Sequence, residues 1–331
     1  MRTTRGSLPC FGLGMAALGR PGYINLNRDS AFGSDARTLD KMQTQADQVL
    51  DVLFRLSQKS GSIPWIDCAR SYGLSEKFVG EYLKKRNIKR DEVYVSSKWG
   101  YTYVADWNVQ LDPGEPHEVK DHSAYNFLKQ LDETVSFLGD YVNLYQIHSA
   151  TLESGVLENA DVHKALSQCR KERGWAIGLS VSSPKQDEVI RRAMEIQVDG
   201  TKLFDSVQCT YNVLEQRPGP VLIEAHQSGM DIIIKEGLAN GRVLQNPIIR
   251  EYSRKLSCEP DQLALACILA QPFRPRVLSG AVTPDQLQSN WAAKELARKL
   301  QEDPTMLAEI MDKTKIESEK YWSERSTLAW N

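Results

Sequence analysis

The chain has 331 residues, of which 41% are hydrophobic and 25% charged, and its formal net charge is −2 at pH 7. This near-balance of charge argues against a nucleic-acid-binding face and against a polybasic membrane surface. No apolar run is long enough to cross a membrane, and the N-terminal stretch MRTTRGSLPC lacks the apolar core of a signal peptide. The six cysteines are scattered without a CxxC pair, so we expect reduced thiols, no metal site and a cytoplasmic protein. No stretch of the sequence reads as a domain linker, so we expect one domain over residues 1–331.

Short apolar runs alternate with helix-patterned segments along the chain. Strands that alternate with helices predict a parallel sheet with right-handed crossovers, and eight such units fit a closed (β/α)8 barrel of the TIM type. An open, doubly wound sheet is the structural alternative. The apolar runs are FGLGMAAL from Phe11, IPWI from Ile63, VYVSS from Val93, VNLYQI from Val142, AIGLS from Ala176, DSVQ from Asp205, DIII from Asp231 and RVLS from Arg276.

Helical periodicity, helix-start residues and a helix-stop glycine indicate where the helices lie. A serine–proline pair and a lone proline are typical of helix starts. Helical faces are expected at 46–53, 128–138 and 162–169 (the last ending before Gly174), starts at Ser183-Pro184 and Pro260, and extra C-terminal helices at 304–324.

Two segments interrupt the alternation. Residues 19–41 are rich in Gly, Asn, Asp and Ser, and residues 101–121 contain Gly114 between two prolines. We expect both to be long loops that follow strands, on the barrel face where active sites lie. The second loop contains HEVKDH, whose histidines are five apart, so we expect a solvated loop and no metal site there.

Polar or ionisable residues end five successive strands. The second ends in Asp67, the third in Lys98, the fourth in His148, the fifth in Ser180, and the sixth reaches Gln208. A barrel brings these ends into one ring. A purely structural ion pair is the alternative, but buried ion pairs are costly and are not a general stabilising device.

Asp67, Tyr72, Lys98 and His148, in this order and at these strand positions, resemble the catalytic tetrad of the aldo-keto reductases. The motif D-x-A-x-x-Y-G stands complete as DCARSYG, and IGLS, VQCTYN and GAVTPDQLQSN extend the resemblance from Phe11 to about Asn290. The resemblance implies a barrel that reduces aldehydes or ketones with a nicotinamide cofactor.

In this interpretation Tyr72 donates a proton to the carbonyl oxygen. The ordinary pKa of tyrosine is about 10, and a nearby ammonium lowers it. Lys98 supplies that ammonium, Asp67 holds Lys98, and His148 orients the carbonyl. The hydride comes from a cofactor, because no side chain carries one.

The resemblance also implies the cofactor residues. Ser180 and Gln208 would hold the nicotinamide carboxamide, while Lys235 stands where the family usually has a stacking aromatic and Val181 where it often has asparagine. The implied cofactor residues are Gly14, Met15, Asp67, Ser180, Gln208, Lys235, Gly237, Leu238, Asn240, Arg242, Gly280, Thr283, Gln286 and Asn290, and the substrate-pocket residues are Tyr23, Trp99 and Tyr101.

The site for the 2′-phosphate of NADPH lacks the cations that many relatives carry. Gly280, Ala281 and Gln286 stand there, but a helix that starts after Pro284 can hold an anion. We therefore expect a weak preference for NADPH with NADH usable, a small carbonyl substrate, and a monomer or small homo-oligomer. The alternatives are a nicotinamide-binding regulatory subunit, such as the potassium-channel β-subunits with this barrel, and an NAD-linked sugar dehydrogenase.

Overall fold

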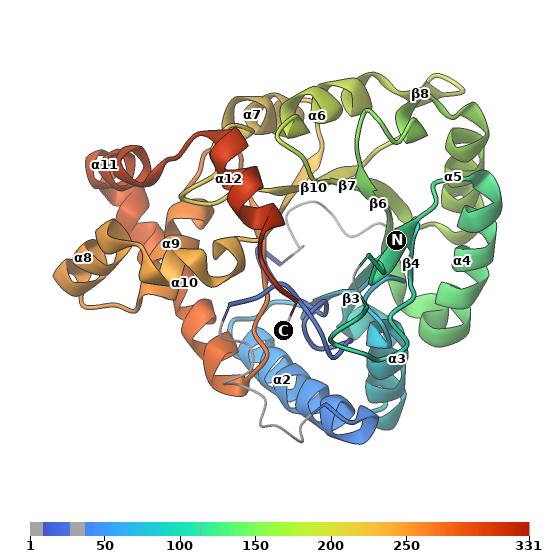
Figure 1. Cartoon of the computed structure of the whole chain (residues 1–331), viewed down its shortest axis with the longest axis horizontal. Helices are drawn as coiled ribbons and strands as arrows, with labels where there is room; N and C mark the ends of the chain where they lie inside the picture. The colour runs from blue at the N-terminus through green and yellow to red at the C-terminus, as the bar shows by residue number, and fades with distance from the viewer. Residues whose placement is uncertain (1–8, 27–36, 113, 331) are drawn as a thin grey trace.

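The computed structural model describes residues 9–26, 37–112 and 114–330. Eight parallel strands close into a barrel in the order β1-β12-β11-β10-β7-β6-β3-β2. Figure 1 shows this ring end-on with helices around it. The predicted TIM-type barrel is confirmed and the open-sheet alternative is wrong. The barrel strands are β1 Phe11–Gly14, β2 Trp65–Asp67, β3 Tyr94–Trp99, β6 Val142–Ala150, β7 Ala176–Val181, β10 Ser206–Thr210, β11 Asp231–Lys235 and β12 Arg276–Ser279.

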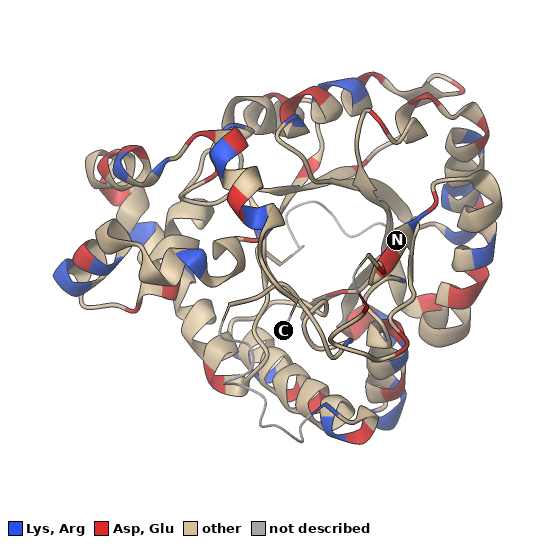
Figure 2. Cartoon of the chain, in the orientation of Figure 1, with Lys and Arg blue, Asp and Glu red and all other residues tan. Residues whose placement is uncertain are grey.

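Amphipathic helices cover the outside of the barrel. Their apolar faces join one core with the outward-facing strand residues, and Figure 2 shows that lysine, arginine and acidic residues are interspersed along the outer helices. The helices are α2 Leu39–Lys59, α3 Ser75–Lys85, α4 Ala124–Leu138, α5 Ala160–Arg173, α6 Gln186–Glu195, α7 Gly219–Gln227, α8 Pro247–Leu256, α9 Pro260–Leu269, α10 Pro284–Glu302, α11 Pro304–Thr314 and α12 Ser318–Ser326.

Helix boundaries and buried helix faces follow the sequence signals with two exceptions. Gly174 ends α5 in the left-handed region, at φ 69°, and α9 begins at Pro260 as expected. In contrast, α6 begins later than predicted, because the main-chain carbonyl of Ser183 accepts from the Gln186 amide in a separate turn. The face of α4 is also shifted, since Leu128 is exposed while Phe127 is buried.

The predicted loop over residues 101–121 contains a small antiparallel hairpin. Its strands are β4 Tyr101–Tyr103 and β5 Glu118–Lys120. The short YTY alternation was too brief to be recognised in the sequence. A second hairpin joins β8 Gln197–Val198 to β9 Thr201–Lys202. Within the loop predicted at 19–41, residues 27–36 lie outside the described residues, and α2 already begins at Leu39.

The extra C-terminal segment predicted at 304–324 is two helices, α11 and α12. Figure 1 shows α12 in front of one end of the barrel. Across the described ranges, no helix combines the length and the hydropathy that a membrane span needs.

Candidate functional site

Asp67, at the end of β2, is the centre of a buried polar cluster. Its carboxylate accepts from the ammonium of Lys98 on β3. It also accepts from Ser96 Oγ at 2.7 Å, Gln208 Nε2 at 3.3 Å and Gln146 Nε2 at 3.4 Å. Because the carboxyl ends of neighbouring parallel strands meet, residues distant in sequence surround one carboxylate. The desolvated charge of Asp67 therefore has an opposite charge and three neutral donors.

Lys98 lies between this carboxylate and the ring of Tyr72. Its side chain is fully buried, and Nζ also donates to the main-chain carbonyl of Cys68 at 3.0 Å. Nζ is 4.7 Å from the centroid of the Tyr72 ring. Burial raises the pKa of the Cys68 thiol well above its ordinary value, which fits a packing residue and not a nucleophile.

Tyr72 and His148 lie side by side, with ring centroids 5.4 Å apart and planes at 86°. Burial, followed by the negative charge of Asp67, raises the pKa of Tyr72 well above its ordinary value. Burial, followed by the positive charge of Lys98, holds the pKa of His148 well below its ordinary value. A protonated phenol and a neutral imidazole therefore share one wall of the site at neutral pH.

Two residues that support His148 were missed in the sequence. Ser71 Oγ lies 3.2 Å from His148 Nδ1. His122 Nε2 lies 2.8 Å from the main-chain carbonyl oxygen of His148, to which it donates. Burial lowers the pKa of His122 to about 4. The HEVKDH segment is therefore not a solvated loop at His122, although no group of His, Cys, Asp and Glu side chains in the described ranges could hold a metal ion.

Aromatic residues and a buried arginine pack around Tyr72 and His148. The guanidinium carbon of Arg20 lies 5.4 Å from the Tyr72 ring centroid, 5.0 Å from that of Tyr23 and 4.7 Å from that of Trp330. Tyr101 packs edge-on against His148 with centroids 5.1 Å apart. Arg20 and Trp330 were not predicted, because neither lies in a motif.

A cavity of about 660 Å³ opens beside this cluster, which is within the range of small-molecule sites. It runs from the ends of β1, β2 and β10 past β11 and β12 to the first turns of α9 and α10. The predicted residues that line it are Gly14, Tyr23, Asp67, Tyr72, Gln208, Lys235, Gly237, Leu238, Asn240, Gly280, Gln286 and Asn290.

Of the other two predicted pocket residues, neither lines this cavity. Tyr101 packs against His148 beside it, whereas the prediction of Trp99 as a pocket wall is wrong. Successive strand residues point to opposite faces. Lys98 points into the barrel, and Trp99 therefore points outward, where it packs on Phe127 of α4 with centroids 5.0 Å apart.

Other predicted cofactor residues lie just outside the lining. The amide of Met15 donates to the carbonyl of Asp67 at 2.9 Å. Ser180 Oγ accepts from the amide of Ser149 at 2.8 Å, which leaves its own O–H free to donate. Arg242 lies over the ring of Tyr321, 4.2 Å from its centroid. Thr283 Oγ1 accepts from the Gln286 amide and caps α10.

Two residues that line the cavity, Gln208 and Asn240, each have a buried side-chain oxygen (Oε1 and Oδ1) with no hydrogen-bond partner among the described residues. Gln208 belongs to the Asp67 cluster, and Asn240 lies in the 3₁₀ segment η5 Ala239–Gln245. Asn240 and Gly241 both have left-handed φ values, 58° and 93°, which fold this segment into a tight bend. Unpaired acceptors on these two residues fit the amide and hydroxyl donors of a nicotinamide dinucleotide.

An ionic network attaches α12 to the end of β11. Arg325 of α12 donates to both carboxylate oxygens of Glu236, at 2.6 Å and 2.8 Å. Lys235 Nζ lies 3.7 Å from Glu236 and donates to Ser182 Oγ and Thr210 Oγ1, both at 2.8 Å. Burial lowers the pKa of Lys235 to about 8, against the opposing charge of Glu236.

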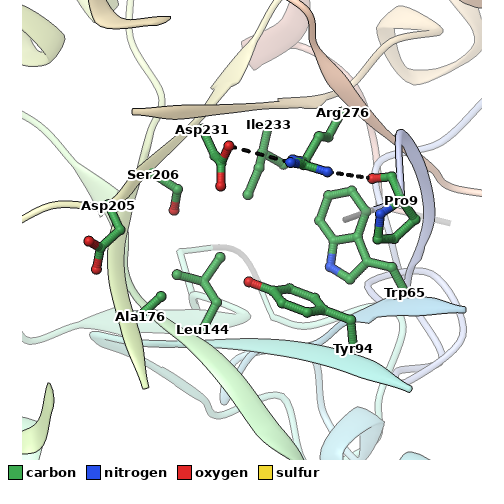
Figure 3. Close-up of a pocket in the computed structure, with 10 residues that line it drawn as sticks. All are labelled: Pro9, Trp65, Tyr94, Leu144, Ala176, Asp205, Ser206, Asp231, Ile233 and Arg276. Carbon is green, nitrogen blue, oxygen red and sulfur yellow. Dashed lines mark hydrogen bonds and ion pairs between the residues drawn. The ribbon is translucent and has the colours of Figure 1, made fainter. Parts of the chain in front are cut away.

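A second, much smaller cavity lies at the opposite end of the barrel (Figure 3). Its volume of about 20 Å³ has room for about one water molecule. Arg276 closes it by donating to the Pro9 carbonyl at 3.0 Å and to Asp231 at 3.4 Å. This is a packed barrel floor, away from the strand ends where barrel enzymes place their active sites.

Comparison with known proteins identifies relatives across most of the chain. A model of the aldo/keto reductase family matches residues 31–312. The NADH-specific methylglyoxal reductase of Escherichia coli K12 is 24% identical over 262 residues, which cover 69% of this chain and 77% of that protein. The uncharacterized oxidoreductase YqkF of Bacillus subtilis 168 is 24% identical over 303 residues, 83% and 90% of the two chains. The holo form of an aldo-keto reductase from Bacillus halodurans has the same fold, with a TM-score of 0.60 and 19% identity over 91% of both chains.

Proposed function

The chain belongs to the aldo-keto reductase family, and on this premise we propose that it reduces an aldehyde or ketone to an alcohol with Tyr72 as the proton donor. It is an NAD(P)-dependent oxidoreductase of the kind that this family contains. The observation that carries the proposal is the contact of Tyr72 with Lys98 and His148 beside a cavity of about 660 Å³ whose lining residues carry unpaired acceptors.

A bound nicotinamide supplies the hydride, which no side chain can supply. Gln208 Oε1 and the free hydroxyl proton of Ser180 are complementary to the two ends of a carboxamide. Asn240 Oδ1 and the backbone from Gly237 to Leu238 would hold the middle of the dinucleotide.

Tyr72 holds its proton until negative charge develops on the substrate oxygen. The ammonium of Lys98 then stabilises the phenolate that remains, and Asp67 keeps this ammonium in place. If Ser71 donates to Nδ1 of the neutral His148, the proton of the imidazole is on Nε2, which can donate to the carbonyl oxygen. General acid catalysis of this type contributes roughly 10²–10⁴-fold to the rate.

The substrate is a small aldehyde or ketone. Tyr23 and Trp330 pack on Arg20, and Tyr101 packs on His148, so we expect a compact carbonyl compound to fit better than a long polar one. The relative from Escherichia coli whose name specifies methylglyoxal supports the same size class.

The expected weak preference for NADPH depends on free anion donors at the start of α10. The Val282 and Gln286 amides there are bonded within the protein, so the expectation loses part of its support. We further propose one domain over residues 1–331, a cytoplasmic location that suits six unpaired cysteines, and a monomer or small homo-oligomer.

The deciding experiment is the loss of NADH and NADPH absorbance with a panel of small aldehydes and ketones that includes methylglyoxal. Turnover in the reductive direction supports the proposal. Tight cofactor binding without turnover of any carbonyl would support the regulatory-subunit alternative. Turnover only of sugars with the oxidised cofactor would support the dehydrogenase alternative.

A further inference from the structure

We infer that the adenosine end of the cavity selects NADH and rejects NADPH; this inference rests on the proposed function, because it concerns the same cofactor site. It reverses the preference expected from the sequence. Carboxylates line this end, several of its donors are already used, and a neighbouring asparagine holds one aspartate in place.

Negative charge predominates where the adenosine would lie. Glu259 and Asp261 at the start of α9 and Asp285 at the start of α10 all line the cavity. Among the described lining residues at this end, Arg250 is the cation, and its Nε donates to the Leu244 carbonyl at 3.0 Å. A 2′-phosphate brings up to two further negative charges and would meet three carboxylates.

Three backbone donors at and just before the start of α10 are occupied. The Val282 amide donates to Gln286 Oε1 at 2.9 Å, and the Gln286 amide donates to Thr283 Oγ1 at 3.2 Å. The Ala281 amide donates to Ser279 Oγ at 3.2 Å. An anion would therefore have to break internal hydrogen bonds before it could use any of these three donors. Asp285 in the first turn already complements the positive end of the helix.

Asp261 is oriented for a hydroxyl donor. Its Oδ2 accepts from Asn290 Nδ2 at 2.6 Å, and Asn290 Oδ1 in turn accepts from Ser279 Oγ at 2.7 Å. A carboxylate can accept about four hydrogen bonds, so Asp261 keeps acceptor sites for the ribose hydroxyls. Other dinucleotide-binding proteins use an acidic residue in the same way, to bind the ribose 2′-OH of NAD. Asp261 is thus the discriminating residue and Asn290 a positioning residue.

The test measures binding and not turnover. Dissociation constants of NADH and NADPH are determined by fluorescence quenching at fixed low salt, together with those of 5′-AMP and 2′,5′-ADP as probes of the adenosine end alone. We expect NADH to bind at least tenfold more tightly than NADPH, and the difference to shrink at high salt, where charge repulsion is screened.

The variants Asp261→Asn and Asp285→Asn remove charge while they keep side-chain size. Each should reduce the preference for NADH several-fold, and the double variant should reduce it at least tenfold, mainly through tighter NADPH binding. Asp285 is exposed, so its variant should fold normally. Asp312→Asn, an exposed position on α11 outside the cavity, is the control for net charge.

Equal or tighter binding of NADPH to the unaltered protein would overturn the inference and leave the proposed function intact. An Asp312→Asn effect as large as that of Asp285→Asn would also overturn it, because the discrimination would then follow total charge. Failure to bind either dinucleotide would instead contradict the proposed function itself, so the two failures are distinguishable.

Discussion

The ammonium of Lys98 donates to the carboxylate of Asp67 in a place where neither side chain is more than 2% exposed. A buried ion pair seldom stabilises a protein more than apolar packing would. Lys98 also lies 4.7 Å from the Tyr72 ring centroid. The pair is therefore best explained by what it does to Tyr72, and removal of Lys98 separates the two effects.

We expect Lys98→Met to lower kcat at least a hundredfold at neutral pH, because no positive charge remains to stabilise the Tyr72 phenolate. The free energy of unfolding should fall by no more than about 3 kcal/mol, the lower end for a broken buried pair, since Asp67 keeps three neutral donors. The pH profile of kcat and a denaturant titration measure both. The control is Lys77→Met on the exposed face of α3, which should change neither the pH profile nor the free energy of unfolding. An active Lys98→Met enzyme with an unaltered pH profile would contradict the role of Lys98 in tuning Tyr72.

Tyr72→Phe removes the proton donor and little else. The hydroxyl of Tyr72 is needed as charge develops on the substrate oxygen, so kcat should fall more than a hundredfold. The dissociation constant of NADH should stay within a few-fold, because the ring and its contact with His148 remain. Measurement of both quantities on the same preparation decides the matter, and retention of more than a tenth of kcat would rule Tyr72 out as the acid.

Lys235 should make binding of the oxidised cofactor depend on pH. Burial lowers its pKa to about 8, so the ammonium is present below pH 8 and lost as the pH rises through that value. A positively charged nicotinamide ring beside it is repelled only by the ammonium form. The affinity for NAD⁺ should therefore increase between pH 7 and pH 9, while that for NADH changes less.

The matched variant for this prediction is Lys235→Met, which keeps an apolar stem of similar length. It should bind NAD⁺ more tightly at pH 7 and show a flat pH dependence. Titrations of NAD⁺ and NADH by fluorescence quenching at several pH values provide the test. A pH dependence that persists unchanged in Lys235→Met would assign the effect to another group.

Gly100 leaves room for the ring of His122, which donates to the main-chain carbonyl of His148. Its φ is +111°, and a Cβ there would lie 2.4 Å from the His122 ring. Gly100→Ala should lower the free energy of unfolding by about 2 kcal/mol or more, through strain and overpacking together. Gly114→Ala, also at positive φ but with nothing within 4 Å of the added Cβ, measures the strain alone. Equal losses in the two variants would show that the contact with His122 is unimportant.

The sequence predicted the barrel and the polar strand ends because both are local patterns. Alternation of apolar runs with helices requires only neighbouring residues, and DCARSYG is a continuous motif. The role of Trp99 was wrong because the pleat direction at Lys98 decides which neighbour faces inward. The Asp261–Asn290 contact could not be predicted, since it joins two helices whose packing only the closed barrel determines. Likewise, no pattern places Arg325 beside Glu236.

Trp330 should shape the substrate pocket and leave the cofactor site unaltered. Its ring stacks on that of His117, with centroids 4.0 Å apart and planes at 3°. It also covers the guanidinium of Arg20, which in turn lies over Tyr72. Trp330→Ala should open this wall, so that KM for small aldehydes rises several-fold and bulky aldehydes gain in relative kcat/KM. Trp330→Phe keeps an aromatic wall and should retain most of the selectivity. Steady-state kinetics with a size series of aldehydes, together with the dissociation constant of NADH, check this. Trp330 is not among the described residues that line the cavity. A parallel loss of NADH affinity would therefore show that Trp330 supports the cofactor site and does not define the substrate pocket.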